Sequence, residues 1–295
     1  MTSSDVLGSY WTVAGPVEIG TGREWSLFDW PERCAQAARV GMTGLGLWHT
    51  DLEHLLESRT MGELRTIFVD AGLRDLEIEF LNDWFVEEGD DRRTASDAQR
   101  DLLFTAAVEL GAHHVKLGNL RRTPASMAQL TDGFAALCAD AAGRGVPPMA
   151  YELMPFDVNA PSLAGVLEIV SASDPAHGGI AIDTWHLGKL GITAEDLRVI
   201  PPERLVHVEL SDGTVANMPD HSHETTRHRR LPGEGEFDIP GYVAVLRELG
   251  YDGPWGVEVL SDALRALPID EIFQRTTDTT SAALGAGVAA GQERP

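Results

Sequence analysis

The chain has 295 residues and a formal net charge of −23, and 43% of its residues are hydrophobic. This composition fits a globular protein with a large core, whereas the strong negative charge argues against nucleic-acid binders, which present a basic face. There is no run of roughly 18 or more apolar residues, so no membrane span is expected.

Two further features predict a cytoplasmic protein. The N-terminal residues MTSSDVLGSYWTV lack the charged and apolar regions of a signal peptide. The 2 cysteines, Cys34 and Cys138, fall in helix-like segments. In a chain of this length they are expected to be buried thiols rather than part of a disulfide framework.

Short apolar runs alternate with segments of helical period along the whole chain. The predicted strands of the first half are YWTVAG (10–15), GLGLWH (44–49), DLEIEFL (75–81) and HHVKLG (113–118). Those of the second half are PMAYEL (148–153), GIAIDT (179–184), LVHVEL (205–210) and WGVEVL (255–260). Strands that alternate with helices imply a parallel sheet.

Proline and glycine mark the ends of the helical segments. Helices are predicted over PERCAQAARVG (31–41), ASDAQRDLLFTAAVELG (95–111) and PGYVAVLRELG (240–250), each of which ends on glycine. Eight strand–helix units in a chain of this length predict an α/β fold, a single-domain (β/α)8 TIM barrel over residues 1–295. Residues 282–295 are expected to form a flexible tail, and residues 212–237, which have no helical period, a long functional loop.

The last four predicted strands each carry one acidic residue near the C-terminal end, on the face opposite the large apolar residues. These residues are Glu152, Asp183, Glu209 and Glu258. Barrel active sites lie at the C-terminal ends of the strands, where these carboxylates would converge and repel one another. A divalent metal ion would neutralise them, and an all-oxygen ligand set favours Mn²⁺ or Mg²⁺, with Co²⁺ and Zn²⁺ as alternatives.

Five motifs resemble the xylose-isomerase-like TIM barrel superfamily, and within it the sugar phosphate isomerase/epimerase family. They are YELMP (151–155), IDTWHLG (182–188), VHVELSDG (206–213), LPGEGEFD (231–238) and GYDGPWGVEVL (250–260). The family includes ketose 3-epimerases, inosose dehydratase and 3-dehydroshikimate dehydratase. The resemblance spans nearly the whole chain, is strongest over about residues 148–260 and is weak before residue 40.

The resemblance implies metal ligands at Glu152, Asp183 and Glu258, and a substrate contact at His186. The third ligand of the family, commonly histidine, falls on Glu209, a departure that adds negative charge. His207 shares the face of Glu209 but lies about 7 Å deeper along the strand, so Glu209 is preferred.

Further residues at the strand ends are candidates for substrate binding. Trp48 and His49 end the second strand and suit stacking on a sugar ring. Glu79 and Glu77 lie on the inward face of the third strand, and Lys116 and His114 share one face of the fourth. One of Arg227, Arg229 and Arg230 is expected to fold over substrate, as an arginine in this loop does in the family.

The predicted function is metal-dependent isomerisation or epimerisation of a keto sugar or an inositol-type ketone through an enediolate, with Glu152 and Glu258 as base and acid. One alternative is a metal-dependent lyase, a dehydratase or 3-keto-glycoside lyase. Another is a non-catalytic sugar-binding barrel or partner subunit, which is considered because Glu209 replaces the histidine ligand that is common in the family. The expected partner is a small-molecule carbohydrate, and binding to nucleic acid or to a membrane is not expected. The sequence does not decide whether the chain forms a homodimer.

Overall fold

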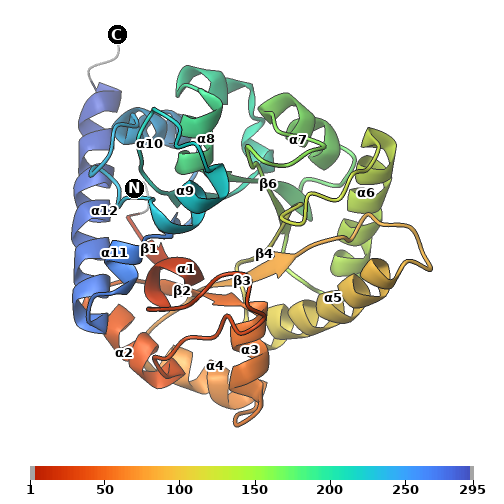
Figure 1. The fold of residues 1–295 in the computed structure, drawn as a ribbon, viewed down its shortest axis with the longest axis horizontal. Helices are drawn as coiled ribbons and strands as arrows, with labels where there is room; N and C mark the ends of the chain where they lie inside the picture. Colours follow the sequence, from red (N-terminus) through yellow and green to blue (C-terminus); the bar gives the residue numbers. More distant parts are fainter. Residues whose placement is uncertain (1–3, 293–295) are drawn as a thin grey trace.

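In the computed structural model, which describes residues 4–292, parallel strands close into a barrel in chain order (Figure 1). The strands are β1 (Val6–Gly8), β2 (Gly44–Trp48), β3 (Asp75–Leu81), β4 (His114–Leu117), β5 (Met149–Glu152), β6 (Gly178–Asp183), β7 (Leu205–Leu210) and β8 (Trp255–Val257). The predicted (β/α)8 barrel is confirmed.

The first predicted strand is wrong. Residues Tyr10–Val13 form the short helix α1, and the strand that closes the barrel is Val6–Gly8. All four residues of α1 are buried. An apolar run without an exposed face has no period that distinguishes a strand from a helical turn, which is why the sequence misplaced this strand.

The helices surround the barrel, and most of them begin at capping side chains. Those before β5 are α2 (Trp30–Arg39), α3 (His49–Leu56), α4 (Met61–Asp70), α5 (Asp91–Leu110) and α6 (Met127–Gly143). Those after it are α7 (Leu163–Val170), α8 (Thr184–Leu190), α9 (His221–Arg227), α10 (Ile239–Glu248), α11 (Asp262–Arg265) and α12 (Ile269–Gln292). The C-cap Gly111 of α5 has a φ of 76°, a conformation that glycine adopts without strain.

Two segments are more ordered than their composition indicates. The predicted loop 212–237 contains the helix α9. Residues 282–292 of the predicted tail belong to α12, in which Ala283 and Leu284 are buried against the barrel, whereas residues 293–295 lie outside the described residues.

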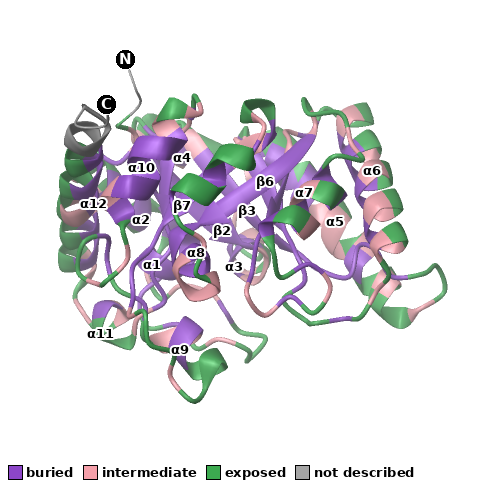
Figure 2. Cartoon of the chain, turned by 90° about the horizontal axis from the view of Figure 1, so that it is seen from above, coloured by how far each residue is buried: buried purple, intermediate pink, exposed green. Residues whose placement is uncertain are grey.

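The hydrophobic core lies between the strands and the inner faces of the helices, while the outer faces of the helices are exposed (Figure 2). Cys34 and Cys138 are buried free thiols, as expected. Among the described residues, no helix is both long enough and apolar enough to cross a membrane.

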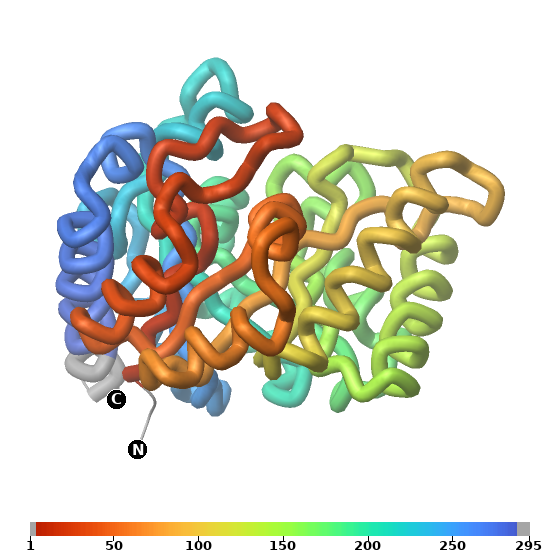
Figure 3. Tube along the Cα trace, turned by 90° about the horizontal axis from the view of Figure 1, so that it is seen from below, coloured from red at the N-terminus to blue at the C-terminus, as the bar shows by residue number. Residues whose placement is uncertain are grey.

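The segments that follow the strands gather at one end of the barrel. Helices α8, α9 and α11 follow β6, β7 and β8, so they lie at the carboxyl ends of these strands. In Figure 3 the red segment between α1 and α2 and the cyan segment around α9 stand at this same end. Together they form the mouth of the barrel.

Candidate active site

Four carboxylates meet at the mouth, one from each of the strands β5 to β8 or from the residue that follows. Glu152, Asp183, Glu209 and Glu258 each offer an oxygen within 4.8 Å of the others. Strand pairing brings them together, because Asp183 lies beside Glu209 in the register of β6 and β7. At most 5% of any of these residues is exposed, so solvent does little to screen their repulsion.

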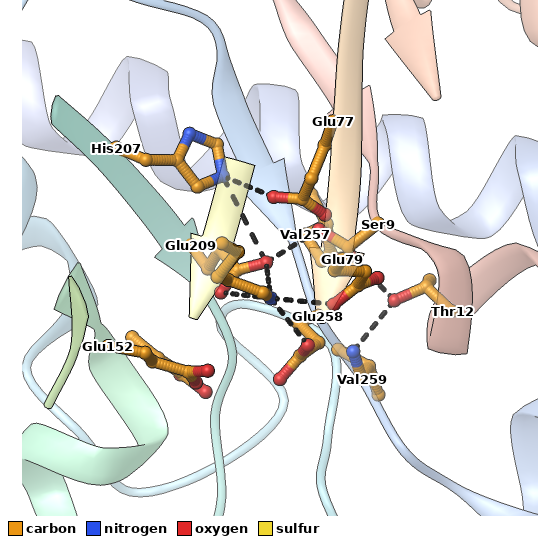
Figure 4. Close-up of polar contacts among 12 residues, drawn as sticks. Ser9, Thr12, Glu77, Glu79, Glu152, His207, Glu209, Val257, Glu258 and Val259 are labelled. Atoms are coloured by element: carbon orange, nitrogen blue, oxygen red, sulfur yellow. Dashed lines mark hydrogen bonds and ion pairs between the residues drawn. The ribbon is translucent and has the colours of Figure 1, made fainter. Parts of the chain in front are cut away.

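Lys116 on β4 supplies a buried positive charge beneath these acids. Its Nζ donates to both carboxylate oxygens of Glu209, at 2.8 and 2.9 Å, and to Glu258 Oε1 at 2.9 Å. It also lies 3.0 Å from Glu79 Oε2. Figure 4 shows Glu79, Glu209 and Glu258 converging in this region. The ammonium group therefore balances the charge that Glu209 adds to the site.

Arg229 supplies the second buried positive charge. Its Nη1 donates to Asp183 Oδ2 at 2.6 Å and to Glu258 Oε2 at 3.0 Å. The same guanidinium group packs over the ring of Trp185 and donates to Thr225 through Nε and Nη2. These contacts hold the arginine at the wall of the site.

His186 follows Asp183 by one helical turn and faces the acids. Its Nε2 lies 3.0 Å from Glu152 Oε1 and 3.4 Å from Asp183 Oδ2. Its Nδ1 has no hydrogen-bond partner among the described residues. The ring also lines the cavity at the mouth, so a bound molecule can reach it.

Burial and mutual repulsion move the pKa values of these acids. Burial first, and then neighbouring carboxylates, raise the pKa of Glu79 and Glu209 well above the usual range. Burial also raises the pKa of Glu258. For Glu152, burial is outweighed by Lys116, His186 and Arg229, and its pKa is lowered. The site therefore carries more negative charge than its two cations balance, and it favours the uptake of protons or of a cation.

A cavity of about 660 Å³ opens above the acids. Its polar lining includes Glu79, Glu152, His186, Arg229 and Glu258. Its apolar lining includes Trp11, Trp48, Phe80, Met154, Phe156 and Leu260. This combination of aromatic walls and convergent polar groups suits a small polar molecule with an apolar face, such as a sugar ring.

The predicted substrate-binding residues fall into two groups. Trp48, His49 and Glu79 line the cavity. Lys116 is fully buried beneath it, in contact with the acids.

Of the three loop arginines, the one that reaches the cavity is Arg229. Arg227 instead pairs with Asp262, and Arg230 Nη1 donates to the Glu234 carbonyl. The structure does not bring Arg227 or Arg230 to this cavity.

Several residues of the cavity wall were not predicted from the sequence. Trp11 lies in the segment that was wrongly predicted as the first strand. Phe156 directly follows the YELMP motif, and this position could have identified it as a residue of the site. Glu24 and Arg121 also line the cavity, from loops without a recognisable pattern.

The donor set fits a divalent cation. The oxygens of the four acids lie close enough together to share one ion, and carboxylate oxygens are the ligands that hard and borderline ions prefer. His207, the alternative third ligand, instead lies deeper beside Glu77 and His114, so the grouping favours Glu209. Lys116 and Arg229 compete for some of the same oxygens.

Comparison with known proteins places the chain in a family. Residues 34–279 match the xylose isomerase-like TIM barrel family. The chain belongs to this family. Among solved structures, the fold is similar to that of the IolI protein with a bound zinc atom, with a TM-score of 0.77 and 17% sequence identity over 95% of this chain and 98% of the other.

The curated relatives that match this chain include dehydratases and isomerases. A 3-dehydroshikimate dehydratase of Pseudomonas aeruginosa is 29% identical over 243 residues, which are 81% of this chain but 37% of the relative. An inosose isomerase of Bacillus subtilis is 24% identical over 113 residues, which are 38% of this chain and 40% of the relative. The chain thus matches well under half the length of these curated relatives.

Proposed function

We propose that this barrel is a metal-dependent enzyme that moves a proton at a carbon next to a carbonyl group of a keto sugar or a cyclic keto polyol. The observation that carries the proposal is the meeting of Glu152, Asp183, Glu209 and Glu258, of which Glu152 and Glu258 line an aromatic-walled cavity together with His186. A soluble, cytoplasmic location is part of the proposal and is supported by the free thiols of Cys34 and Cys138.

Glu152, Asp183, Glu209 and Glu258 would hold the ion. When bound, a divalent ion supplies a positive charge that stabilises the oxyanion developing on the substrate carbonyl. Mn²⁺ is the ion proposed, because all the ligands are carboxylates.

The proton would be exchanged by Glu152 and Glu258, which both line the cavity. They come from β5 and from the residue after β8, so they approach a bound substrate from two different strands of the barrel. One would remove the proton and the other would return it.

His186 would orient the substrate. Its Nε2 lies 3.0 Å from Glu152 Oε1, so the ring would fix the position of that carboxylate while it contacts a molecule in the cavity. Arg229 lines the same cavity and would donate to an oxygen on the far side of the substrate.

Return of the proton to the other face or to the neighbouring carbon gives an epimer or an isomer, which is the reaction we propose. The second candidate is elimination of a β-hydroxyl group from the substrate after the same proton has been removed. The likeness to the dehydratase of Pseudomonas aeruginosa over 81% of this chain favours it.

The test is to incubate the Mn²⁺-loaded protein in D₂O with a panel of ketoses, inososes and 3-dehydroshikimate. Deuterium exchange with an epimeric or isomeric product, detected by NMR, would support the isomerase. An enone that absorbs in the ultraviolet would support the lyase instead. Absence of both with every compound, from protein that binds the sugars, would favour a non-catalytic barrel. Glu152→Gln and Glu258→Gln serve as controls for contaminating enzymes.

A further inference from the structure

A second polar layer lies one step deeper in the barrel than the mouth acids. It consists of Glu77 on β3, His114 on β4 and His207 on β7, none of which has any exposed surface. Each residue stands two positions before a residue of the layer above, so its side chain points to the same interior face. These side chains are not part of the cavity wall described above.

The two imidazole rings converge on a single carboxylate oxygen. His114 Nε2 and His207 Nε2 each lie 3.1 Å from Glu77 Oε2, and the two ring centroids are 4.1 Å apart. Figure 4 shows His207 and Glu77 facing each other across the interior. Three donor atoms from three strands therefore surround one point.

Hydrogen bonds account for only part of this arrangement. The contact between His114 and Glu77 has hydrogen-bond geometry, and His207 Nε2 reaches the same oxygen, Glu77 Oε2, at 3.1 Å. His207 Nδ1 and Glu77 Oε1 have no hydrogen-bond partner among the described residues. Buried polar atoms are nearly always satisfied. The atoms that converge are the two Nε2 atoms and Glu77 Oε2, and these three residues form a grouping that suits a metal ion.

Two glycines on the neighbouring strands make room for these side chains. A Cβ at Gly256 would lie 2.6 Å from His207 Nε2, and a Cβ at Gly46 would lie 2.9 Å from Glu77 Oε1. Side chains at either position would displace the donor atoms. The layer is thus shaped around the imidazole and the carboxylate.

Charge in the interior points to a cation. Six buried carboxylates lie in the two layers, and the buried basic side chains beside them are Lys116 and Arg229. The carboxylates are Glu77, Glu79, Glu152, Asp183, Glu209 and Glu258. A divalent ion at the mouth would leave net negative charge in the barrel, and buried charge is costly unless it is balanced.

We propose that Glu77, His114 and His207 bind a second divalent metal ion in the interior of the barrel, of the zinc type. Two imidazoles and one carboxylate form a ligand set typical of zinc, unlike the carboxylates of the mouth. The ion ties β3, β4 and β7 together directly below Lys116 and Glu209. This site does not depend on the proposed reaction.

The test uses the complete chain, expressed with zinc in the medium and dialysed in its native state against EDTA before elemental analysis. The ion lies among side chains with no exposed surface, so it should resist extraction until the chain unfolds. Wild type and the Glu152→Gln/Glu258→Gln variant should each retain one zinc per chain. His207→Gln and Glu77→Gln should retain none. His113→Gln is the matched control, because its ring contacts His114 without belonging to the ligand set, and it should retain zinc.

Folding of each variant is checked by circular dichroism, and a measurement on wild type keeps the test valid if the variants do not fold. Wild type expressed with cobalt and dialysed in the same way should retain one Co²⁺ per chain and show visible absorption bands of Co²⁺ bound to nitrogen and oxygen ligands. A dialysed wild type without zinc and without these bands would overturn the proposal. Zinc retained equally by folded wild type, His207→Gln and Glu77→Gln would also overturn it.

Discussion

Replacement of Lys116 by methionine tests the charge balance of the mouth. Methionine keeps most of the apolar stem and removes the ammonium group, which is fully buried and contacts Glu79, Glu209 and Glu258 at 2.8 to 3.0 Å. Breaking a buried ion pair on one side costs about 3–5 kcal/mol of stability.

Proton uptake gives an independent figure for the same loss. One carboxylate that loses its counter-charge can take up a proton, and because the glutamate has an ordinary pKa in the unfolded chain, keeping it protonated in the folded state costs about 3.7 kcal/mol at pH 7 and about 1 kcal/mol at pH 5. We therefore expect Lys116→Met to lower the free energy of unfolding by about 3–4 kcal/mol at pH 7, and by much less at pH 5.

The assay is urea unfolding of the metal-free protein, followed by circular dichroism at both pH values. The matched control is the double variant Lys116→Met/Glu209→Gln, in which the unbalanced charge is removed together with the lysine. It should be more stable at pH 7 than Lys116→Met alone. A Lys116→Met protein as stable as wild type at pH 7, or a loss that is the same at pH 5, would refute this view of the site.

Three further predictions concern the same residues. Glu152→Gln or Glu258→Gln should lower kcat by on the order of 10²–10⁴-fold while the circular dichroism spectrum stays that of wild type, and full activity in either would remove that residue from proton transfer. The metal-free wild type should lose stability as the pH rises above about 4.3. The reason is that the raised pKa values of Glu79 and Glu209 make the folded state bind more protons than the unfolded state above this pH. With saturating Mn²⁺, the urea concentration at the midpoint of unfolding should depend less on pH. Arg229→Met should lower kcat/KM by about 10–100-fold, through the loss of charged hydrogen bonds, and by more than Arg227→Met or Arg230→Met; equal losses in steady-state assays would contradict the assignment of Arg229 to the cavity.

Strands with a clear period could be predicted from the sequence almost to the residue. Asp75–Leu81 and Leu205–Leu210 match their predicted limits, because charged residues alternate there with large apolar ones. Alternation also predicted that Asp183 and Glu209 share the interior face. The first strand failed because three residues are too few to show a period and because the apolar run beside it is buried in a helical turn.

The choice among the loop arginines needed tertiary structure. Asp212 and Arg230 form one antiparallel bridge, and His228 and Ser261 form another. With residues 228 and 230 held in this way, the side chain of Arg229 projects to the opposite side, where it meets Asp183. Neither bridge can be predicted from the sequence of residues 212–237, which has no periodic pattern of apolar residues.

The role of Lys116 was also out of reach of the sequence. The alternation of side chains placed Lys116 on the same face as His114, but its burial depends on carboxylates that arrive from β3, β7 and the end of β8. Only the closed barrel brings these acids within reach of one ammonium group.

The most direct test of the central claim is a crystal of the protein grown with Mn²⁺ and measured at the manganese absorption edge. We predict one anomalous peak at the mouth of the barrel, within bonding distance of Glu152, Asp183 and Glu258. A well-ordered mouth with no peak between these three carboxylates would contradict the account.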